Sequence, residues 1–146
     1  MKIALGSDHA GFHLKEDIKK YLVEKQIETI DCGSFSDQRC DYPDFGHKVA
    51  KTVQNGSVDY GIVICGSGIG ISISANKVKG IRCALCSEPL SAKLSRNHNN
   101  CNMLAMGARL IGLDMAKEIV DTFVQSKFEG GRHIRRVEKI EEDLWV

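Results

Sequence analysis

The stretch Tyr60-Gly-Ile-Val-Ile-Cys-Gly-Ser-Gly-Ile-Gly70 decides the fold of this 146-residue chain. Residues 62–65 form an unbroken apolar run, which is typical of a short strand buried on both faces. Glycines follow at alternate positions, and the apolar segment after them is long enough for a helix. A strand, a glycine-rich turn and a helix N-terminus bring free backbone N–H groups together. The stretch therefore predicts either a site for a small anion or an ordinary glycine turn.

Cys65 is the last residue of the expected strand and stands beside the expected helix N-terminus. A thiol in that position can be partly thiolate near neutral pH, so Cys65 is a candidate reactive residue; inert packing is the alternative. A nucleotide site is not predicted. The dinucleotide fingerprint G-x-G-x-x-G would need glycine at Ile71 or Ile73, and no G-K-S/T follows any glycine.

Composition argues against several classes of protein. The net charge of +1 disfavours a broad nucleic-acid surface, and no apolar run approaches the ~20 residues of a membrane span. An expected strand begins at Lys2 and leaves no room for a signal peptide, so the six cysteines indicate a reducing cytoplasm rather than disulfides. Cys83 and Cys86 form a C-x-x-C, but positions three apart on a strand face opposite sides, and no second pair completes a metal site.

Strand and helix patterns alternate along the whole chain. The expected strands cover residues 2–5, 28–32, 62–65, 81–86 and 102–106. The expected helices cover residues 14–22, 43–55, 71–75, 89–96 and 115–124, and a last helix opens within 129–136. Residues 97–102 are expected to form a polar loop. The alternation predicts an α/β protein with a three-layer Rossmann-like fold, in which a five-stranded parallel sheet has helices on both faces, in a single domain spanning residues 1–146.

Two other groups of residues suggest ligand contacts. Asp8 and His9 fall in the first βα turn, where open α/β sheets bind ligands; a helix cap is the alternative for Asp8. Arg132 and Arg136 are four apart and share a helix face, where a bound phosphate would offset their unfavourable interaction with the helix dipole. A solvated basic patch is the alternative for this pair. Asp31 ends the second strand as a ribose-binding acid would, but the preceding turn lacks the matching glycines.

Seven motifs in order cover nearly the whole chain and resemble the ribose-5-phosphate isomerase B family, which includes galactose-6-phosphate isomerase subunits and allose-6-phosphate isomerase. They are Gly6-Ser-Asp-His-Ala-Gly11, Asp41-Tyr-Pro43, Cys65-Gly-Ser-Gly-Ile-Gly70, Ala75-Asn-Lys77, Cys86-Ser-Glu-Pro89, Ser95-Arg-Asn-His-Asn99 and Glu129-Gly-Gly-Arg-His133. The resemblance implies an aldose–ketose isomerisation through an enediolate, without metal or other cofactor.

The resemblance also implies a role for each matching residue. Cys65 would be the base, and the Ile71 that stands where some members place a glutamate base favours this assignment. His98 would open the sugar ring, and Asp8 would handle the proton of a sugar hydroxyl. Ser67 would be a further catalytic residue beside the base. The remaining positions would contact the substrate: the amides of Gly66, Gly68 and Gly70 at the oxyanion, Asn99 and Tyr42 at the sugar, and His9, Arg132, Arg136 and the additional Arg109 at the phosphate.

The expected reaction is the interconversion of ribose 5-phosphate and ribulose 5-phosphate. The alternatives are the same chemistry on a six-carbon substrate, allose or galactose 6-phosphate, and a non-catalytic phosphate-binding module. His98 lies on an expected connection into the fifth strand, so it should lie at the end of the sheet opposite Cys65. We therefore expect a homodimer with shared active sites, or a tetramer built from such dimers.

Overall fold

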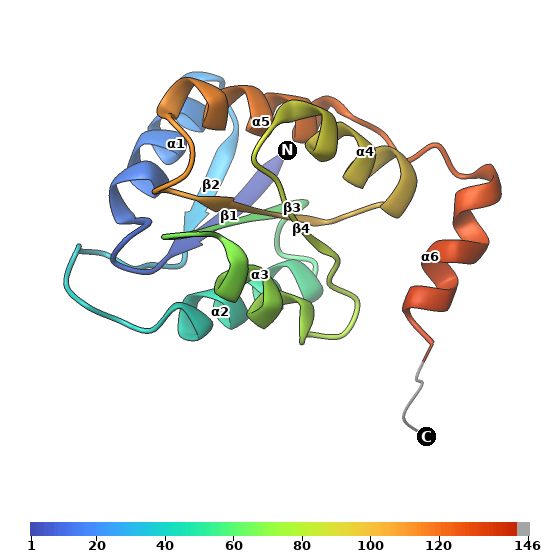
Figure 1. Ribbon diagram of the computed structural model, residues 1–146, viewed down its shortest axis with the longest axis horizontal. Coiled ribbons are helices and arrows are strands. Elements are labelled where there is room, and N and C mark those ends of the chain that lie inside the picture. The colour runs from blue at the N-terminus through green and yellow to red at the C-terminus, as the bar shows by residue number, and fades with distance from the viewer. Residues whose placement is uncertain (143–146) are drawn as a thin grey trace.

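One parallel sheet, with the strand order β2-β1-β3-β5-β4, forms the middle layer of the protein (Figure 1). The computed structural model describes residues 1–142, so residues 143–146 of the expected domain lie outside the described residues. The strands are β1 (Lys2–Ser7), β2 (Glu28–Asp31), β3 (Tyr60–Cys65), β4 (Cys83–Leu85) and β5 (Met103–Gly107). The helices are α1 (Phe12–Glu24), α2 (Tyr42–Gln54), α3 (Ile69–Asn76), α4 (Pro89–Asn99), α5 (Leu113–Gln125), the 3-10 turn η1 (Gly131–His133) and α6 (Ile134–Ile140).

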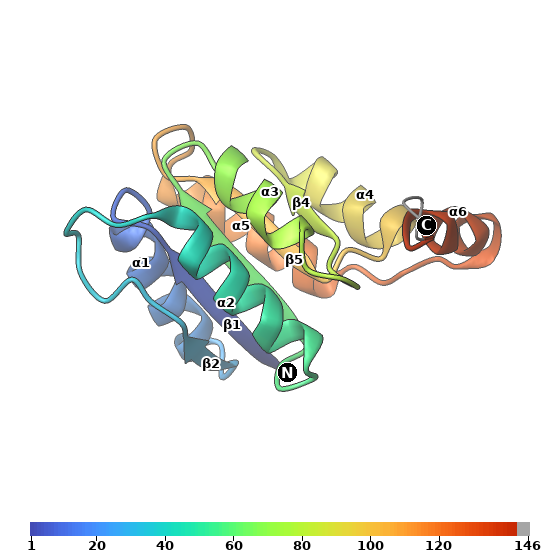
Figure 2. The same ribbon diagram turned by 90° about the horizontal axis from the view of Figure 1, so that it is seen from below.

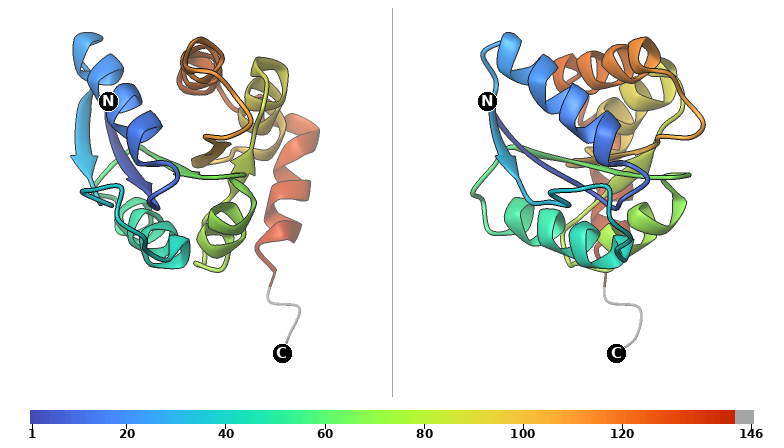
Figure 3. Two further views of the ribbon diagram at one scale, coloured as in Figure 1. Left: turned by 60° about the vertical axis from the view of Figure 1, so that its left-hand side comes forward. Right: turned by 90° about the vertical axis from the view of Figure 1, so that its left-hand side faces the viewer.

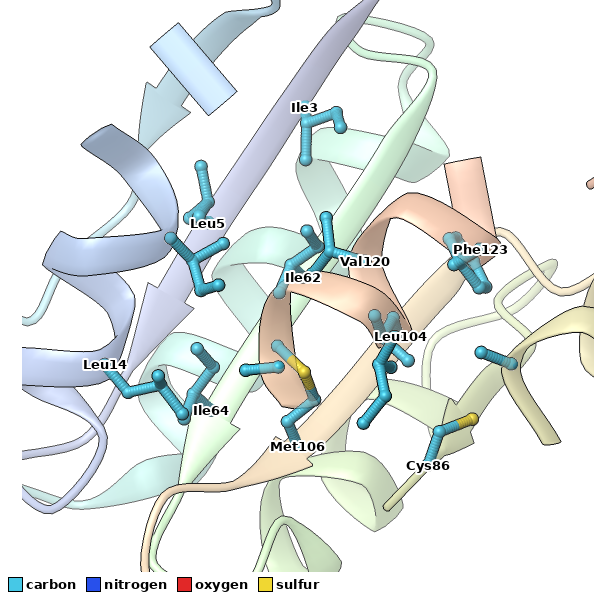
Figure 4. Packing of buried hydrophobic residues seen from close by; sticks show 14 of the residues in the cluster. Ile3, Leu5, Leu14, Ile62, Ile64, Cys86, Leu104, Met106, Val120 and Phe123 are labelled. Atoms are coloured by element: carbon cyan, nitrogen blue, oxygen red, sulfur yellow. The ribbon is translucent and has the colours of Figure 1, made fainter. Parts of the chain in front are cut away.

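Helices cover both faces of this sheet, as the sequence predicted, and the predicted fold class is confirmed (Figures 1 and 3). Helices α1, α4 and α5 pack on one face, where strand residues such as Leu5, Ile62 and Leu104 meet Val120 and Phe123 of α5 (Figure 4). Helices α2 and α3 pack on the other face, against the alternate strand positions. Burial on both faces explains the unbroken apolar run of β3. Within residues 1–142 no helix is both long and apolar enough to cross a membrane.

The strand register brings three strand ends to one edge of the sheet. Ser7 of β1 pairs with Ile64 of β3, and Cys65 of β3 pairs with Gly107 of β5. The turns that follow these strands therefore lie side by side at the carboxyl edge, where open sheets bind ligands.

Several predicted boundaries were wrong. Strand β4 starts at Cys83 rather than residue 81, because the N–H of Ile81 donates to the carbonyl of Val78 in a turn. It also ends before Cys86. Helix α3 starts at Ile69 rather than Ile71, since the left-handed backbone of Gly68 (φ 77°) starts the helix directly after the turn.

A further error concerns residues 97–99, which continue α4 instead of forming a loop. Arg82 donates from Nε to the carbonyl of Asn99 and from Nη2 to that of Asn100. Arg96 donates to the carbonyl of Cys101, and Asn100 ends the helix in the left-handed conformation (φ 47°). Hydrogen bonds from two arginines thus stabilise the C-terminal end of α4, where the residues themselves have low helix propensity.

The chain beyond α5 leaves the layered body. Helix α6 has no buried residue and lies beyond the end of α4, away from the sheet (Figure 2). An ion pair between Arg82 and Glu141 links its end to the body. The predicted last helix is therefore divided: Arg132 belongs to η1, and Arg136 belongs to α6.

Candidate active site

The turn after β3 points an amide at the sulfur of Cys65. The thiol is buried, and the backbone N–H of Gly68 donates to its Sγ at 3.1 Å. Besides its positive φ, Gly68 has no room for a side chain, because a Cβ there would lie 2.9 Å from the carbonyl oxygen of Met106. The turn therefore packs directly on β5. The sulfur thus accepts a backbone hydrogen bond inside the turn, directly before the start of α3.

A cavity of about 630 Å³ opens over this turn at the carboxyl edge. Seven of the predicted site residues line it: Asp8, Tyr42, Cys65, Gly66, Ser67, Gly70 and Arg109. Its other three lining residues, Ile69, Ile73 and Leu110, are apolar, and each is more than half exposed. One chain thus forms a polar pocket with an open apolar rim.

Tyr42 and Arg109 reach this cavity from neighbouring elements. A Cβ on Gly70 would lie 2.5 Å from Cζ of Tyr42, so the ring lies directly on the turn. A Cβ on Gly66 would lie 3.2 Å from Nη1 of Arg109, and the backbone N–H of Arg109 donates to the carbonyl of Gly66. The guanidinium group of Arg109 therefore lies beside Gly66, the residue after Cys65.

The first βα turn supplies Asp8 and His9. The Oδ1 of Asp8 accepts from the backbone N–H groups of Ala10 and Gly11, at 2.9 and 3.0 Å, so this buried carboxylate shapes its own turn while lining the cavity. Nδ1 of His9 lies 3.2 Å from the carbonyl oxygen and 3.3 Å from the amide nitrogen of Cys40, which ties the turn to the segment before α2.

The other four predicted residues lie elsewhere. His98 and Asn99 are in the last turn of α4, which leads into the amino end of β5, whereas Cys65 pairs with the carboxyl end of that strand. Arg132 and Arg136 stand on η1 and α6 beyond the same end of α4. We call Asp8, His9, Tyr42, residues 65–70 and Arg109 the Cys65 cluster. We call His98, Asn99, Glu129, Arg132, His133 and Arg136 the His98 cluster.

Comparison with known proteins gives a consistent result. The family model described as Ribose/Galactose Isomerase matches residues 3–140. The chain is 55% identical to ribose-5-phosphate isomerase B of Escherichia coli over 139 residues, which cover 95% of this chain and 93% of that protein. The chain belongs to the ribose/galactose isomerase family.

Solved structures of related isomerases have the same fold. A Clostridium thermocellum ribose-5-phosphate isomerase B has a TM-score of 0.96 at 53% identity, with 97% of this chain and 95% of that chain covered. The Mycoplasma genitalium ribose-5-phosphate isomerase B with bound ribulose-5-phosphate has a TM-score of 0.90 at 43% identity, with 96% and 93% covered. The family resemblance seen in the sequence motifs is confirmed.

In this family member, sequence reasoning missed an ion network between α1 and the end of β2. The side chain of Lys15 is fully buried, and its Nζ lies 2.7 and 2.8 Å from the two carboxylate oxygens of Asp31. Lys19 reaches Asp31 at 2.6 Å, and Gly33 donates its N–H to the same carboxylate. Burial opposes the charge of Asp31, but the hydrogen bonds from both lysines outweigh it and lower its pKa to about 2. The negative charge of Asp31 is therefore balanced by the two lysines.

This network supports the end of β1, which is followed directly by Asp8 and His9. The carbonyl of Gly33 accepts from the N–H of Ser7 at 2.7 Å, and the N–H of Ser34 donates to the carbonyl of Ser7 at 2.8 Å. Helical spacing could have revealed that Lys15 shares the buried stripe with Leu14 and Ile18. A lysine on that stripe needs a carboxylate partner.

Glu129 and His133 were also missed as members of the His98 cluster. The rings of His98 and His133 stack with their centroids 4.5 Å apart, and Glu129 lies beside both rings. No sequence signal links the three, because Glu129 and His98 are 31 positions apart and meet only through the path of the chain after α5.

Proposed function

We propose that this isomerase interconverts ribose 5-phosphate and ribulose 5-phosphate through an enediolate, with Cys65 as the base and without a metal or other cofactor. The observation that carries the proposal is the buried Sγ of Cys65, which accepts an amide hydrogen bond in a cavity at the carboxyl edge of the sheet. The names of the related proteins support ribose 5-phosphate as the substrate.

In the proton transfer, Cys65 acts as the base and the backbone amides of the turn bind the negative charge. The Cys65 thiolate removes the proton from C2 of the open-chain aldose, the C2–H electron pair forms the C1–C2 double bond, and negative charge develops on the carbonyl oxygen. The amides of residues 66–70 stabilise that charge. Return of the proton from sulfur to C1, together with transfer of the C2 hydroxyl proton to O1, gives the ketose. Ser67 lies beside the base, where its Oγ accepts from the N–H of Ile69 at 3.3 Å and its hydroxyl proton remains available to the sugar.

Ring opening uses the His98 cluster of a second subunit. His98 protonates the ring oxygen as the C1–O bond breaks, and Asp8 takes the proton of the anomeric hydroxyl. Because His98 lies toward the opposite end of the sheet from the Cys65 of its own chain, a two-fold dimer supplies it from the partner subunit and forms two shared sites. The exposed Ile69 and Ile73 at the cavity rim and the unburied α6 support an interface there.

Substrate contacts divide between the two subunits in the same way. Tyr42 binds the sugar from the Cys65 side, and Asn99 binds it from the partner. His9 and Arg109 meet the phosphate from one side, while Arg132 and Arg136 bind it from the other with bidentate geometry. The homodimer, or a tetramer of two dimers, is therefore the functional form of the residue 1–146 domain. The free state of all six cysteines supports a cytoplasmic location.

The family name also includes galactose isomerases, so a six-carbon sugar phosphate is the second candidate substrate. One assay separates the candidates: the purified protein is given ribose 5-phosphate, allose 6-phosphate and galactose 6-phosphate side by side, with EDTA present. We expect the highest kcat/KM with ribose 5-phosphate. A higher value with either hexose phosphate would reassign the substrate, and the absence of turnover with all three would favour a binding module.

A further inference from the structure

His133 forms a flat surface against which His98 lies. The two rings are 11° from parallel with their centroids 4.5 Å apart. The side chain of His133 is 8% exposed and that of His98 is 36% exposed, so the inner ring is held by its surroundings and the outer ring faces the solvent. The proposed function uses His98 and assigns no role to His133.

Burial and neighbouring positive charges hold the pKa of His133 below its ordinary value, which favours its neutral form near neutral pH. Burial lowers the pKa of His133, and the positive charges on His98, Arg132 and Arg136 lower it further, against the opposing effect of Glu129. A neutral ring can stack on His98 in either protonation state, whereas a second imidazolium would repel a protonated His98.

Glu129 is fixed to the same turn of α4 that carries His98. Its backbone N–H donates to the carbonyl of Asn97 at 3.0 Å, and the Nδ2 of Asn97 donates to its Oε1 at 3.0 Å. Its Oε2 is left 3.8 Å from Nε2 of His133 and 4.0 Å from Nε2 of His98. The carboxylate thus lies near the Nε2 atoms of both rings.

This arrangement does not suit a metal ion, although the three ligand atoms lie within 4.8 Å of one another. A metal bound to an imidazole nitrogen lies about 2.0–2.1 Å away in the plane of the ring. Two nearly parallel rings stacked face to face cannot both hold one ion in their planes. The geometry fits ring positioning instead.

Building on the proposed function, we infer that His133 is a positioning residue for His98. Its buried ring fixes the plane of the His98 imidazole, while the carboxylate of Glu129 lies 4.0 Å from Nε2 of His98, so that His98 meets the ring oxygen of a cyclic sugar phosphate in the partner's site. A proton donor must lie within hydrogen-bond reach of its acceptor, and a displacement of ~1 Å can cost about 100-fold in rate. The stack supplies that precision on a side chain that is otherwise exposed.

The test compares His133→Ala, which removes the stacking surface, with His133→Phe, which keeps a flat ring without a titratable group. With ribose 5-phosphate, which is largely cyclic, we expect kcat to fall at least about tenfold in the alanine variant and to recover to within about threefold in the phenylalanine variant. With ribulose 5-phosphate, which stays open-chain because its 5-oxygen carries the phosphate, we expect kcat to change less than about threefold in both. His47→Ala, a half-buried histidine on α2, is the control.

A measurement without substrate separates this inference from the proposed function. The chain has five histidines, so the His98 ring proton can be identified by NMR from its loss in His98→Gln. We expect its resonance to move downfield in His133→Ala and upfield in His133→Phe, whose ring current is stronger. If the resonance moves this way while the wild type isomerises no sugar phosphate, the stack stands and the proposed function fails. An unmoved resonance, or equal losses of kcat with both substrates, would overturn the positioning role.

Discussion

The Cys65 cluster and the His98 cluster serve one proposed reaction but are built differently. The Cys65 cluster stands on the ends of β1, β3 and β5 and is supported by both packed faces of the sheet. The His98 cluster stands on the last turn of α4 and on α6, which has no buried residue. In the proposed mechanism, proton transfer at carbon therefore uses a site built within one folded chain, whereas ring opening and part of the phosphate binding use the His98 cluster of a second chain.

The largest expected effect is the loss of the base from the Cys65 cluster. Cys65→Ala should lower kcat by about 10²–10⁴-fold, because no other group replaces the proton acceptor. The fold should persist, since the sulfur fills little space. Binding of ribose 5-phosphate by calorimetry should also persist, because the phosphate contacts are untouched.

Cys40→Ala is the matched control for this variant, because Cys40 is a partly buried cysteine in the segment near His9. Its kcat should stay within about threefold of the wild type. If the activity of Cys65→Ala stayed within a few-fold of the wild type, Cys65 would not be the base. The division of the reaction between the two clusters would then be wrong.

The second prediction tests whether the clusters of different chains meet. Cys65→Ala and His98→Ala homodimers should both be impaired with cyclic ribose 5-phosphate. In a heterodimer of the two, one site carries both substitutions and the other carries neither. Co-expression with two affinity tags, followed by tandem purification, should therefore give a heterodimer with about half the wild-type activity.

The control is the tandem-purified heterodimer of two Cys65→Ala chains with different tags, which should stay inactive. Heterodimers of the two variants that form but show no recovery would break the shared-site model and confine each cluster to its own chain.

Sequence reasoning predicted the Cys65 cluster more completely than the His98 cluster. The Cys65 turn is local, since a buried strand, alternate glycines and a helix start follow one another within residues 60–76. The end of α4 is not local: Arg82 and Arg96 stabilise the helix through residue 99, and neither contact has a pattern in the sequence. Glu129 and His133 join His98 only because the chain returns past α4 after α5.

The same reasoning explains why Lys15 and Asp31 were not paired in advance. The periodicity of α1 predicts a helix whether or not one charged residue faces inward. The partner of that residue depends on the register of β2 against β1, where Leu5 pairs with Asp31. Fold class follows from patterns along the chain, whereas contacts between strands and helices need the three-dimensional arrangement.

The third prediction weakens the phosphate contacts of the His98 cluster. The double substitution Arg132→Ala and Arg136→Ala should raise KM for ribose 5-phosphate by about 10- to 100-fold, since each charge-assisted hydrogen bond contributes about 1.5–3 kcal/mol before solvent screening at these exposed positions. The kcat should fall less, because remote binding energy serves mainly to orient the substrate. Steady-state kinetics measure both constants.

Arg135→Ala is the matched control, because Arg135 is an exposed arginine on the same helix with no role in the proposed site. If the control raised KM as much as the double variant, general positive charge rather than a built phosphate site would explain the effect.

The smallest expected effects distinguish the ion pairs that support each cluster. The pKa of Asp31 is lowered from 3.8 to about 2, so its charge stabilises the folded state above pH 3.8, and this contribution is lost as the pH falls through about 2. The difference corresponds to about 2 kcal/mol of unfolding free energy near neutral pH. The half-buried Arg82–Glu141 pair, which links α6 to the body, should contribute about 1 kcal/mol or less.

Urea unfolding of the wild type, Asp31→Asn and Glu141→Gln at pH 7, 5 and 3 tests this contrast. Asp31→Asn should be the least stable at pH 7, because it also leaves the buried Lys15 without its main partner. Its gap from the wild type should narrow at pH 3, because Asp31 of the unfolded chain, with a pKa of 3.8, is by then largely protonated while Asp31 of the folded chain is still charged. The small gap of Glu141→Gln should stay near 1 kcal/mol or below at each pH. A gap for Asp31→Asn that stays constant with pH would mean that packing rather than charge stabilises the base of the Cys65 cluster. The residues that support the two clusters would then differ only in how deeply they are buried.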